Sequence, residues 1–421
     1  MKALLVDCRV NQGYVTSLAE MRNLLGTLEI EVAYTAYTNL KDPNKVAYVG
    51  KGFLASCVQY AKAYDVDIVV FNNDLSPLQI RNLSDAFGLE VFDRSMIIIK
   101  IFEMRANTKE AKLQVEIAAL RYNQTRLVES TANYDQMTSG GAGGATNRGS
   151  GEKMINVRRS QIRALIHRKE QELEEIVSNR EKLRNKRKKN LPVVAIVGYT
   201  NAGKSTLMNR LIGLTDNIKK DTILEENRLF ATLSTTTRYI KTDKHYPFLI
   251  TDTVGFISNL PTSLIKAFRS TLEEIKEADL IVEVADISDE NFLEQIHITN
   301  KTIADIAKDK PIVYIYNKVD QFKGKLLPMP LDDELIVSLH DETYLPQVLD
   351  LIDKALSFYY YEVTLNIPYE KSDDFYKLKN EEAISSYKED EKGYVVEAKI
   401  ARTMYAYYKD YISSFENEKE E

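Results

Sequence analysis

The segment GYTNAGKSTL, residues 198–207, places two glycines around four residues and follows them with Lys204 and Ser205. The apolar run VVAIVG precedes the segment and KSTLMNRLIG is typical of a helix, which predicts a strand-to-helix turn. Glycine allows such a turn to curl until its N–H groups converge on an anion, and the helix dipole adds a positive field. Lys204 then reaches the outer phosphates of a nucleotide, while the Ser205 hydroxyl binds Mg²⁺.

The pattern therefore predicts a phosphate-binding loop, and the alternative is a glycine-rich turn of an ordinary α/β domain. The residues expected to contact the nucleotide in this loop are Gly198, Tyr199, Thr200, Asn201, Ala202, Gly203, Lys204, Ser205 and Thr206. Three further motifs favour a phosphate loop, because each one ends a predicted parallel strand, where nucleotide sites of α/β proteins lie.

Two of these motifs are expected to contact opposite ends of the nucleotide, the phosphates and the base. In DTVG, residues 252–255, Asp252 holds Mg²⁺ through a water and the Gly255 N–H meets the γ-phosphate. In NKVD, residues 317–320, the Asp320 carboxylate accepts two N–H bonds from guanine, a pair that adenine does not offer, so GTP and GDP are the expected ligands. The third motif, VSLH, supports the base and is the weaker signal. The residues expected in these contacts are Asp252, Thr253, Val254, Gly255, Asn317, Lys318, Val319, Asp320, Ser338, Leu339 and His340.

The segment FATLSTTTR, residues 230–238, lies between the phosphate loop and DTVG. A threonine in such a segment closes on Mg²⁺ only when the γ-phosphate is present. Thr232 is the expected residue and Thr236 the second choice, and the alternative is a polar loop without a special role. Ser205 and Thr232 are thus the expected Mg²⁺ ligands, and the expected nucleotide contacts are Phe230, Ala231, Thr232, Leu233 and Ser234.

Phe256 stands directly after DTVG, where many such hydrolases carry a Gln that orients the attacking water. A phenyl ring cannot hydrogen-bond water, so slow intrinsic hydrolysis is expected. Asn201 offers help if it holds K⁺ near the phosphates, and the alternative is a side chain that stabilises the loop. The expected catalytic residues are Lys204, Thr232 and Asn201.

Four segments with different patterns must position these residues. Residues 1–107 alternate short β-branched runs with polar helical segments, which predicts a small N-terminal α/β domain. Residues 108–190 carry helical spacing on both sides of a Gly-rich loop at 138–152, which predicts a long antiparallel helical hairpin. Residues 191–359 hold near-continuous apolar strands, typical of a P-loop GTPase domain with a mostly parallel sheet. Residues 360–421 combine strands and a helix in a small C-terminal α+β domain.

Composition narrows the class further. The 421 residues carry a net charge of −6, so the whole molecule is not a typical nucleic-acid binder. Two cysteines and four histidines, without a CxxC pair, argue against a disulfide framework and a Cys/His metal cluster. Because no signal peptide and no apolar run of about 20 residues is present, we expect a cytoplasmic protein without membrane insertion. The basic stretch 153–189 is either a solvated face or a phosphate-binding surface.

These motifs together resemble those of the HflX-type GTPases, within the larger Obg-HflX group. The resemblance rests on GYTNAGKSTL, FATLSTTTR and DTVGFI, and extends to VVFNNDLSPLQIRNLSDAFGLEVFDRSMIIIKIF upstream and to NRGSGE in the Gly-rich loop. It implies a GTPase that associates with the large ribosomal subunit, contacts its rRNA through the N-terminal domain and hairpin, and splits or rescues stalled ribosomes under stress. We expect the protein to be a monomer. Ser234 and Thr235 stand where the family has Asp-Pro, so the first switch loop is expected to be less pre-ordered.

A second function is compatible with the same motifs. In this alternative the GTPase is a scaffold that binds a protein partner through the hairpin, without RNA contact. RNase treatment separates the two hypotheses, because a protein scaffold keeps its partner when RNA is removed. A small-molecule kinase on a phosphate-loop fold is disfavoured, because NKVD selects guanine.

Overall fold

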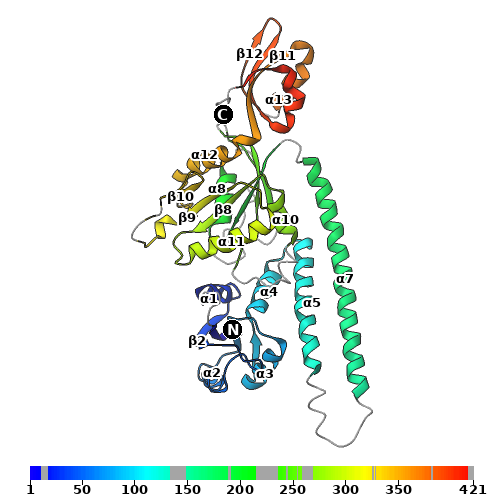
Figure 1. The fold of residues 1–421 in the computed structure, drawn as a ribbon, viewed down its shortest axis with the longest axis vertical. Helices are drawn as coiled ribbons and strands as arrows, with labels where there is room; N and C mark the ends of the chain where they lie inside the picture. Colours follow the sequence, from blue (N-terminus) through cyan, green and yellow to red (C-terminus); the bar gives the residue numbers. More distant parts are fainter. Residues whose placement is uncertain are drawn as a thin grey trace, which may run out of the picture. The chain divides into compact units, whose positions relative to one another are not determined.

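The computed structural model describes residues 1–10, 18–132, 148–187, 191–214, 236–242, 245–253, 255–257, 269–324, 327, 329–380 and 383–415. The chain divides into two units. The colours of Figure 1 follow the residue number. Within the described ranges, unit 1 contains residues 1–179, 255–257 and 269–272, and unit 2 contains residues 180–214, 236–253 and 273–415. In this part of the chain no helix combines the length and the apolar composition needed to cross a membrane.

Unit 1 begins with a four-stranded parallel sheet in the order β2-β1-β3-β4. Its strands are β1 Lys2–Val10, β2 Glu31–Leu40, β3 Ile68–Phe71 and β4 Glu90–Phe92, and its helices are α1 Leu18–Thr27, α2 Lys51–Ala63, α3 Pro77–Phe87 and α4 Arg94–Arg105. Successive side chains of a strand point to opposite faces, so Ala3 and Leu5 pack with α1 and α4, whereas Leu4 and Val6 pack with α2 and α3. The expected α/β architecture is therefore confirmed for this region.

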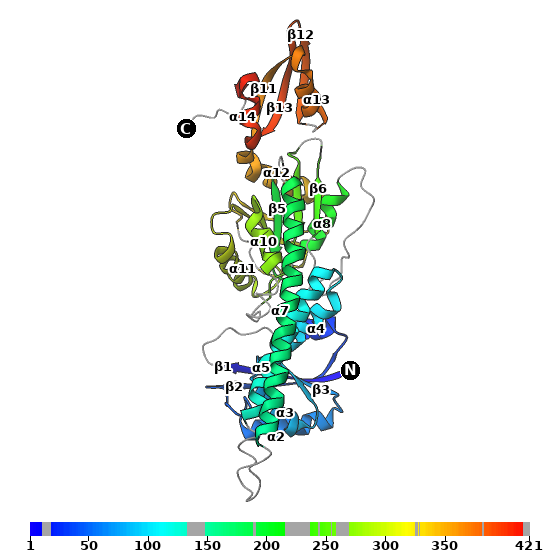
Figure 2. The ribbon, with the colours of Figure 1, turned by 90° about the vertical axis from the view of Figure 1, so that its right-hand side faces the viewer.

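Two long helices follow, α5 Lys109–Ala132 and α7 Arg148–Arg187, which lie next to each other in Figure 1 and overlap in Figure 2. Three ion pairs join them: Lys109 with Glu172 at 2.7 Å, Glu116 with Lys169 at 2.5 Å, and Arg121 with Glu170 at 2.5 Å. From Lys109 to Glu116 the residue number on α5 rises, whereas the partner on α7 changes from Glu172 back to Lys169. The two helices are therefore antiparallel.

The expected Gly-rich loop is too long at one end. Residues 138–147 lie outside the described residues, but α7 already begins at Arg148, so residues 148–152 are helical rather than loop. Gly149 and Gly151 each disfavour a helix by about 1 kcal/mol relative to alanine. A helix of 40 residues propagates over two such positions because each added residue gains a backbone hydrogen bond.

Unit 2 contains a six-stranded sheet in the order β10-β9-β8-β5-β7-β6. Its strands are β5 Val193–Gly198, β6 Thr236–Ile240, β7 Phe248–Asp252, β8 Leu280–Asp286, β9 Ile312–Asn317 and β10 Glu334–Ile336, and its helices are α8 Lys204–Gly213, α10 Arg269–Glu277 (whose first four residues belong to unit 1), α11 Phe292–Ile306 and α12 Leu345–Leu356. Every pair is parallel except β6 with β7. The predicted strands are confirmed, and their continuous apolar character reflects burial under α8 and α12 on one face and α11 on the other.

The chain ends in a four-stranded antiparallel sheet in the order β12-β13-β11-β14. Its strands are β11 Tyr360–Pro368, β12 Ile384–Asp390, β13 Gly393–Ala401 and β14 Ile412–Phe415, with helices α13 Ser372–Asn380 and α14 Tyr405–Tyr408. Short 3₁₀ turns η1 to η6 span Val319–Gln321, Glu342–Tyr344, Ser357–Tyr359, Tyr369–Lys371, Arg402–Met404 and Lys409–Tyr411. This region has the expected α+β character.

An aromatic contact joins the C-terminal sheet to the turn between β6 and β7. Tyr246 stacks on Tyr360 with ring centroids 4.6 Å apart and planes 4° apart. The Tyr246 hydroxyl donates to Glu362 at 2.8 Å, and the Tyr360 hydroxyl donates to the Pro247 carbonyl at 2.6 Å. Lys399 completes the junction, because its Nζ lies 4.2 Å from the centre of the Tyr246 ring and 3.3 Å from Glu362.

Candidate nucleotide-binding site

The predicted phosphate loop connects β5 to α8, and its two glycines occupy positions that other residues disfavour. Gly198 has φ +140°, and a Cβ there meets the Val284 carbonyl oxygen at 2.1 Å. Gly203 has φ +106°, and a Cβ there meets the Asn317 amide nitrogen at 2.1 Å. Asn201 between them has φ +63°, a left-handed conformation that asparagine tolerates. The glycine spacing in the sequence therefore reflects close backbone approach at both ends of the loop.

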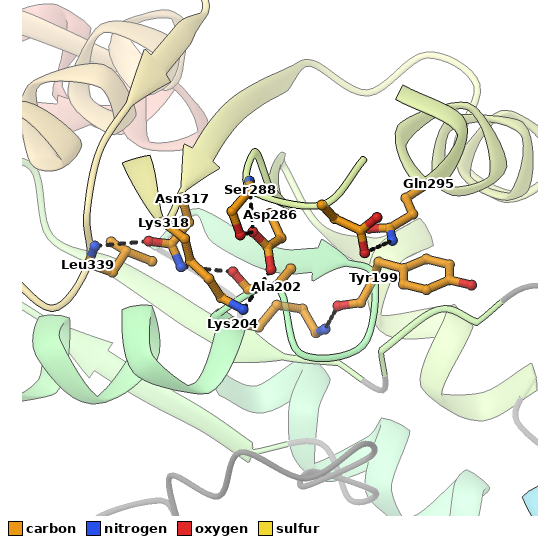
Figure 3. Close-up of polar contacts among 10 residues, drawn as sticks. Tyr199, Ala202, Lys204, Asp286, Ser288, Gln295, Asn317, Lys318 and Leu339 are labelled. Atoms are coloured by element: carbon orange, nitrogen blue, oxygen red, sulfur yellow. Dashed lines mark hydrogen bonds and ion pairs between the residues drawn. The ribbon is translucent and has the colours of Figure 1, made fainter. Parts of the chain in front are cut away.

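Lys204, the first residue of α8, is only 7% exposed. Its Nζ donates to the carbonyl of Gly198 at 3.0 Å and to that of Tyr199 at 2.6 Å, and Figure 3 shows the second of these contacts. Burial lowers the pKa of Lys204 to about 8, although nearby Asp252 acts in the opposite direction. The loop therefore surrounds a desolvated ammonium that neutral carbonyl dipoles stabilise, and an anion added here would be attracted strongly.

Oxygen atoms from two motifs meet beside this lysine. The Ser205 hydroxyl donates to Asp252 Oδ2 at 3.4 Å, and Asp252 is fully buried at the end of β7. The Thr253 hydroxyl donates to the Ile196 carbonyl at 2.7 Å, which fixes the end of β7 against β5. A hydroxyl beside a carboxylate is a donor set that suits Mg²⁺, which prefers oxygen ligands and keeps several waters. The residues present thus fit the expected ion.

Asn317, at the end of β9, connects three of the predicted motifs. Its side chain is 2% exposed, its amide nitrogen donates to the Ala202 carbonyl at 2.8 Å, and its amide oxygen accepts from Leu339 N at 2.9 Å (Figure 3). One amide therefore holds the phosphate loop, the NKVD segment and the VSLH segment in a fixed arrangement. The sequence predicted these motifs at one edge of the sheet, and the hydrogen bonds place them there.

The NKVD segment continues into η1 with Lys318 in a left-handed conformation, φ +66°. Hydrogen bonding from the Ser338 hydroxyl is the main cause that lowers the pKa of Asp320, so its carboxylate is ionised at neutral pH. His340 is exposed, and its carbonyl accepts from Arg210 Nη2 of α8 at 3.2 Å. An anionic acceptor therefore lies in the segment where guanine recognition was predicted.

Asp286 and Ser288 also belong to this region, but they were not predicted from the sequence. Asp286 ends β8, and its Oδ2 lies 2.6 Å from Lys318 Nζ. Its Oδ1 accepts from the Ser288 backbone N–H at 3.0 Å and hydroxyl at 2.6 Å. A signal existed, because the strand DLIVEVAD ends in a carboxylate and β8 lies between β5 and β9 in the sheet.

The remaining predicted residues differ in how far the structure describes them. Tyr199, Thr200 and Ala202 are buried in the loop, Thr206 is half-buried on α8, and Val319 begins η1. Gly255 belongs to unit 1, where Ile257 nearby packs into the apolar cluster of α1 and α4. The residues that lie outside the described ranges are Phe230, Ala231, Thr232, Leu233, Ser234 and Val254.

Family models match three successive parts of the chain. A model described as GTP-binding GTPase N-terminal matches residues 15–103, one described as GTP-binding GTPase middle region matches residues 105–187, and one described as 50S ribosome-binding GTPase matches residues 193–318. The middle match begins and ends close to the helical hairpin, and the third match begins at β5.

Two curated relatives cover most of the chain. The GTPase HflX of Caldanaerobacter subterraneus subsp. tengcongensis is 37% identical over 386 residues, 91% of this chain and 87% of its own. The GTPase HflX of Alkalihalophilus pseudofirmus is 40% identical over 358 residues, 84% of this chain and 82% of its own. A solved GTP-binding protein from Sulfolobus solfataricus in complex with GDP is 22% identical, covers 85% of this chain and 99% of its own, and has a TM-score of 0.43.

The sequence relatives are similar well beyond the nucleotide motifs, through the N-terminal sheet and the hairpin. Their name, GTPase, agrees with a phosphate loop built on a mostly parallel sheet. This chain belongs to the HflX family of GTPases.

Proposed function

We propose that this GTPase is a nucleotide-gated protein that binds the large ribosomal subunit and separates or rescues stalled ribosomes. The observation that carries the proposal is the Asn317 amide, which holds the phosphate loop and the base-recognition segments together within one unit. The family model for ribosome-binding GTPases over residues 193–318 supports the choice of partner.

In the proposed site, each end of GTP has its own set of groups. Lys204 exchanges its two loop carbonyls for the β- and γ-phosphates, and Ser205 and Asp252 would hold Mg²⁺, which would neutralise phosphate charge. Asp320 accepts the two N–H groups of the guanine edge. The proposed closing residue, Thr232, belongs to the segment outside the described residues.

The proposed RNA contact is made by exposed arginines of α7. Arg158, Arg163 and Arg168 are exposed, whereas Ile166 is buried. Arginine pairs with phosphate through two N–H donors, and each phosphate contact releases counterions. These arginines are therefore suited to an RNA backbone, and RNA binding is expected to weaken with salt.

The proposal is tested by co-sedimentation with large ribosomal subunits, with a non-hydrolysable GTP analogue or GDP. More protein is expected to pellet with the analogue. Binding strength falls with salt, and the slope of log K against log salt counts the phosphate contacts. Changing Arg158, Arg163 and Arg168 to Gln is expected to make this slope shallower by about two to three. A matched control lowers the net charge by the same amount but keeps the arginines, by adding three carboxylates at exposed positions of α7: Gln161→Glu, Gln171→Glu and Ser178→Asp.

Two results count against the proposal. One is equal pelleting in every nucleotide state, which removes the gating. The other is a triple arginine variant no weaker than its control, which removes the phosphate contacts from α7. Binding that survives RNase treatment supports the scaffold alternative, in which the hairpin contacts a protein.

Asn201 is proposed to hold K⁺ near the phosphates, because Phe256 cannot orient water. Its exposed side chain and left-handed backbone allow a clean test, since Asn201→Gly keeps the backbone conformation and removes the amide. Loss of K⁺ stimulation with unchanged GDP affinity is expected in turnover assays. Equal turnover of the wild type in Na⁺ and K⁺ contradicts the role.

A further inference from the structure

A shielded ion pair beside the nucleotide site lies outside the sequence motifs. Asp286 Oδ2 and Lys318 Nζ are 2.6 Å apart, and their side chains are only 16% and 14% exposed. Little water screens a pair with this exposure, so its attraction exceeds that of a surface pair. Figure 3 shows Asp286 next to Lys318, close to Asn317 and Lys204.

Asp286 is oriented by its own turn. The Ser288 N–H and hydroxyl both donate to Oδ1, which leaves Oδ2 for the lysine. The Asp289 N–H closes the turn on the Asp286 carbonyl at 3.2 Å, and Asp289 in turn accepts from Gln295 of α11 at 2.9 Å. The turn after β8 therefore orients the carboxylate, and Gln295 of α11 holds that turn.

Lys318 is fixed at both ends. Its backbone has the left-handed φ of +66° between the locked Asn317 and the turn that contains Asp320. Its ammonium is anchored at the end of β8. A lysine held in this way presents its four-carbon stem as an apolar surface of fixed position, although a free lysine side chain samples many rotamers.

We infer that Asp286 is a positioning residue for guanine recognition. It holds the Lys318 stem as a wall on which the flat face of the base lies, while Asp320 binds the edge of the base. Asp286 itself needs no contact with the nucleotide. The inference rests on the proposed role of Asp320 and adds a residue that acts through Lys318.

The test is GDP dissociation and steady-state turnover of the full chain. Asp286→Asn keeps the shape and the acceptor for Ser288 but removes the charge. GDP release is expected to be at least tenfold faster and KM for GTP to rise to the same degree, with kcat within twofold, because the base end contributes equally to the ground and transition states. In a Lys318→Met background, Asp286→Asn is expected to add less than twofold.

Two further variants separate positioning from general stability. Ser288→Ala keeps the charge of Asp286 but loosens its orientation, so a smaller acceleration of GDP release, about two- to fivefold, is expected; this variant carries the test if Asp286→Asn does not fold. Asp350→Asn removes one exposed carboxylate of α12 in the same unit and is expected to leave GDP release unchanged.

Three outcomes overturn the inference: a lower unfolding midpoint with unchanged GDP release, tighter GDP binding in Asp286→Asn, or an equal effect of that substitution with and without Lys318. Asp320→Asn separates this failure from failure of the site. If Asp320→Asn weakens GDP and Asp286→Asn does not, only the positioning role is wrong. If neither substitution weakens GDP, the proposed base site is wrong as well.

Discussion

At the carboxyl end of the N-terminal sheet, buried polar side chains pair with one another. Asn72 donates to Asp7 at 2.9 Å and accepts from Arg94 at 3.0 Å, and Arg94 also contacts Glu20 at 3.1 Å. The same end of the sheet in unit 2 carries Lys204, whose ammonium has the loop carbonyls as hydrogen-bond partners. The first sheet is parallel and the second mostly parallel, and both carry polar groups where ligands usually bind, yet they differ in what those groups contact.

This contrast separates features of a ligand site from features of a structural polar cluster. The N-terminal cluster joins opposite charges, so a ligand there must break ion pairs between side chains. In unit 2, Gly198 and Gly203 lie where a Cβ would clash with neighbouring protein atoms, and the neutral carbonyl partners of Lys204 are groups that anionic phosphates could replace. Polar residues at strand ends therefore indicate a ligand site when close-packed glycines and replaceable neutral partners accompany them.

The largest expected effect tests the N-terminal cluster. Arg94 is 1% exposed and pairs with Glu20 at 3.1 Å, so Arg94→Leu removes the cation of a shielded ion pair and is expected to cost about 3–5 kcal/mol of unfolding free energy. Urea unfolding measures this loss, and GDP affinity of the folded protein is expected to stay the same. Arg22→Leu, at an exposed arginine that contacts Thr35, is the control and is expected to change little. Weaker GDP binding by the folded Arg94→Leu variant would show that the N-terminal cluster contributes to ligand binding as well as to stability.

The opposite pattern is expected for Lys204. Lys204→Ala is expected to weaken GTP and GDP binding at least 100-fold, about 2.7 kcal/mol, because the phosphates lose their only buried cation in the proposed loop. The empty protein is not expected to become less stable, because the buried ammonium is costly to desolvate. Micromolar GTP affinity in this variant, measured by titration calorimetry, is incompatible with the proposed phosphate loop.

The pH dependence of GDP binding tests whether Lys204 contributes to ligand binding rather than to stability. The pKa of Lys204 lies near 8, below its ordinary value, so its contribution to stability is present above the unfolded pKa and is lost as pH falls through 8. Phosphates favour the protonated form, so GDP affinity is expected to fall about tenfold per pH unit above pH 8. Calorimetry in buffers of different ionisation enthalpy is expected to show uptake of nearly one proton at pH 9. Affinity that is flat from pH 7 to 9.5 argues against this titration.

A smaller effect is expected inside the sheet. Glu283 lies in β8, and burial raises its pKa to about 8, so its contribution to stability is complete below the unfolded pKa and is lost as pH rises through 8. Glu283→Gln is expected to raise the unfolding free energy by about 1 kcal/mol at pH 9, since the buried amide is itself costly, and not at pH 5. Urea unfolding at both pH values measures the difference. An equal gain at pH 5 shows that ionisation is not the cause.

Much of the nucleotide site was predictable because it is encoded locally. The glycine spacing, the lysine after it and the apolar strands all lie within short segments, and the structure places Asn317, Leu339 and the loop together. The Asp286–Lys318 pair joins two strands 32 residues apart, so no local pattern contains it. The N-terminal cluster was missed for the same reason, because Asp7, Asn72 and Arg94 meet only when three strands pair.

The helix boundary at Arg148 illustrates a different limit. Glycine content alone predicted a loop to residue 152, but a local preference of about 1 kcal/mol per glycine does not decide the end of a helix with 40 residues. Antiparallel pairing of β6 with β7 was equally invisible, because strand direction depends on the length of the connection rather than on the composition of the strand.

The stacked tyrosines at the turn between β6 and β7 have a mechanical consequence. β7 ends at Asp252, and β6 begins at Thr236 inside the segment 230–238, so this hairpin connects the two stretches that are proposed to contact Mg²⁺ and the γ-phosphate. Tyr246 contacts both Tyr360 and the Lys399 ammonium, and so joins the turn of the hairpin to the last sheet of the chain. A change in the position of the hairpin therefore requires either movement of the C-terminal sheet or loss of these contacts.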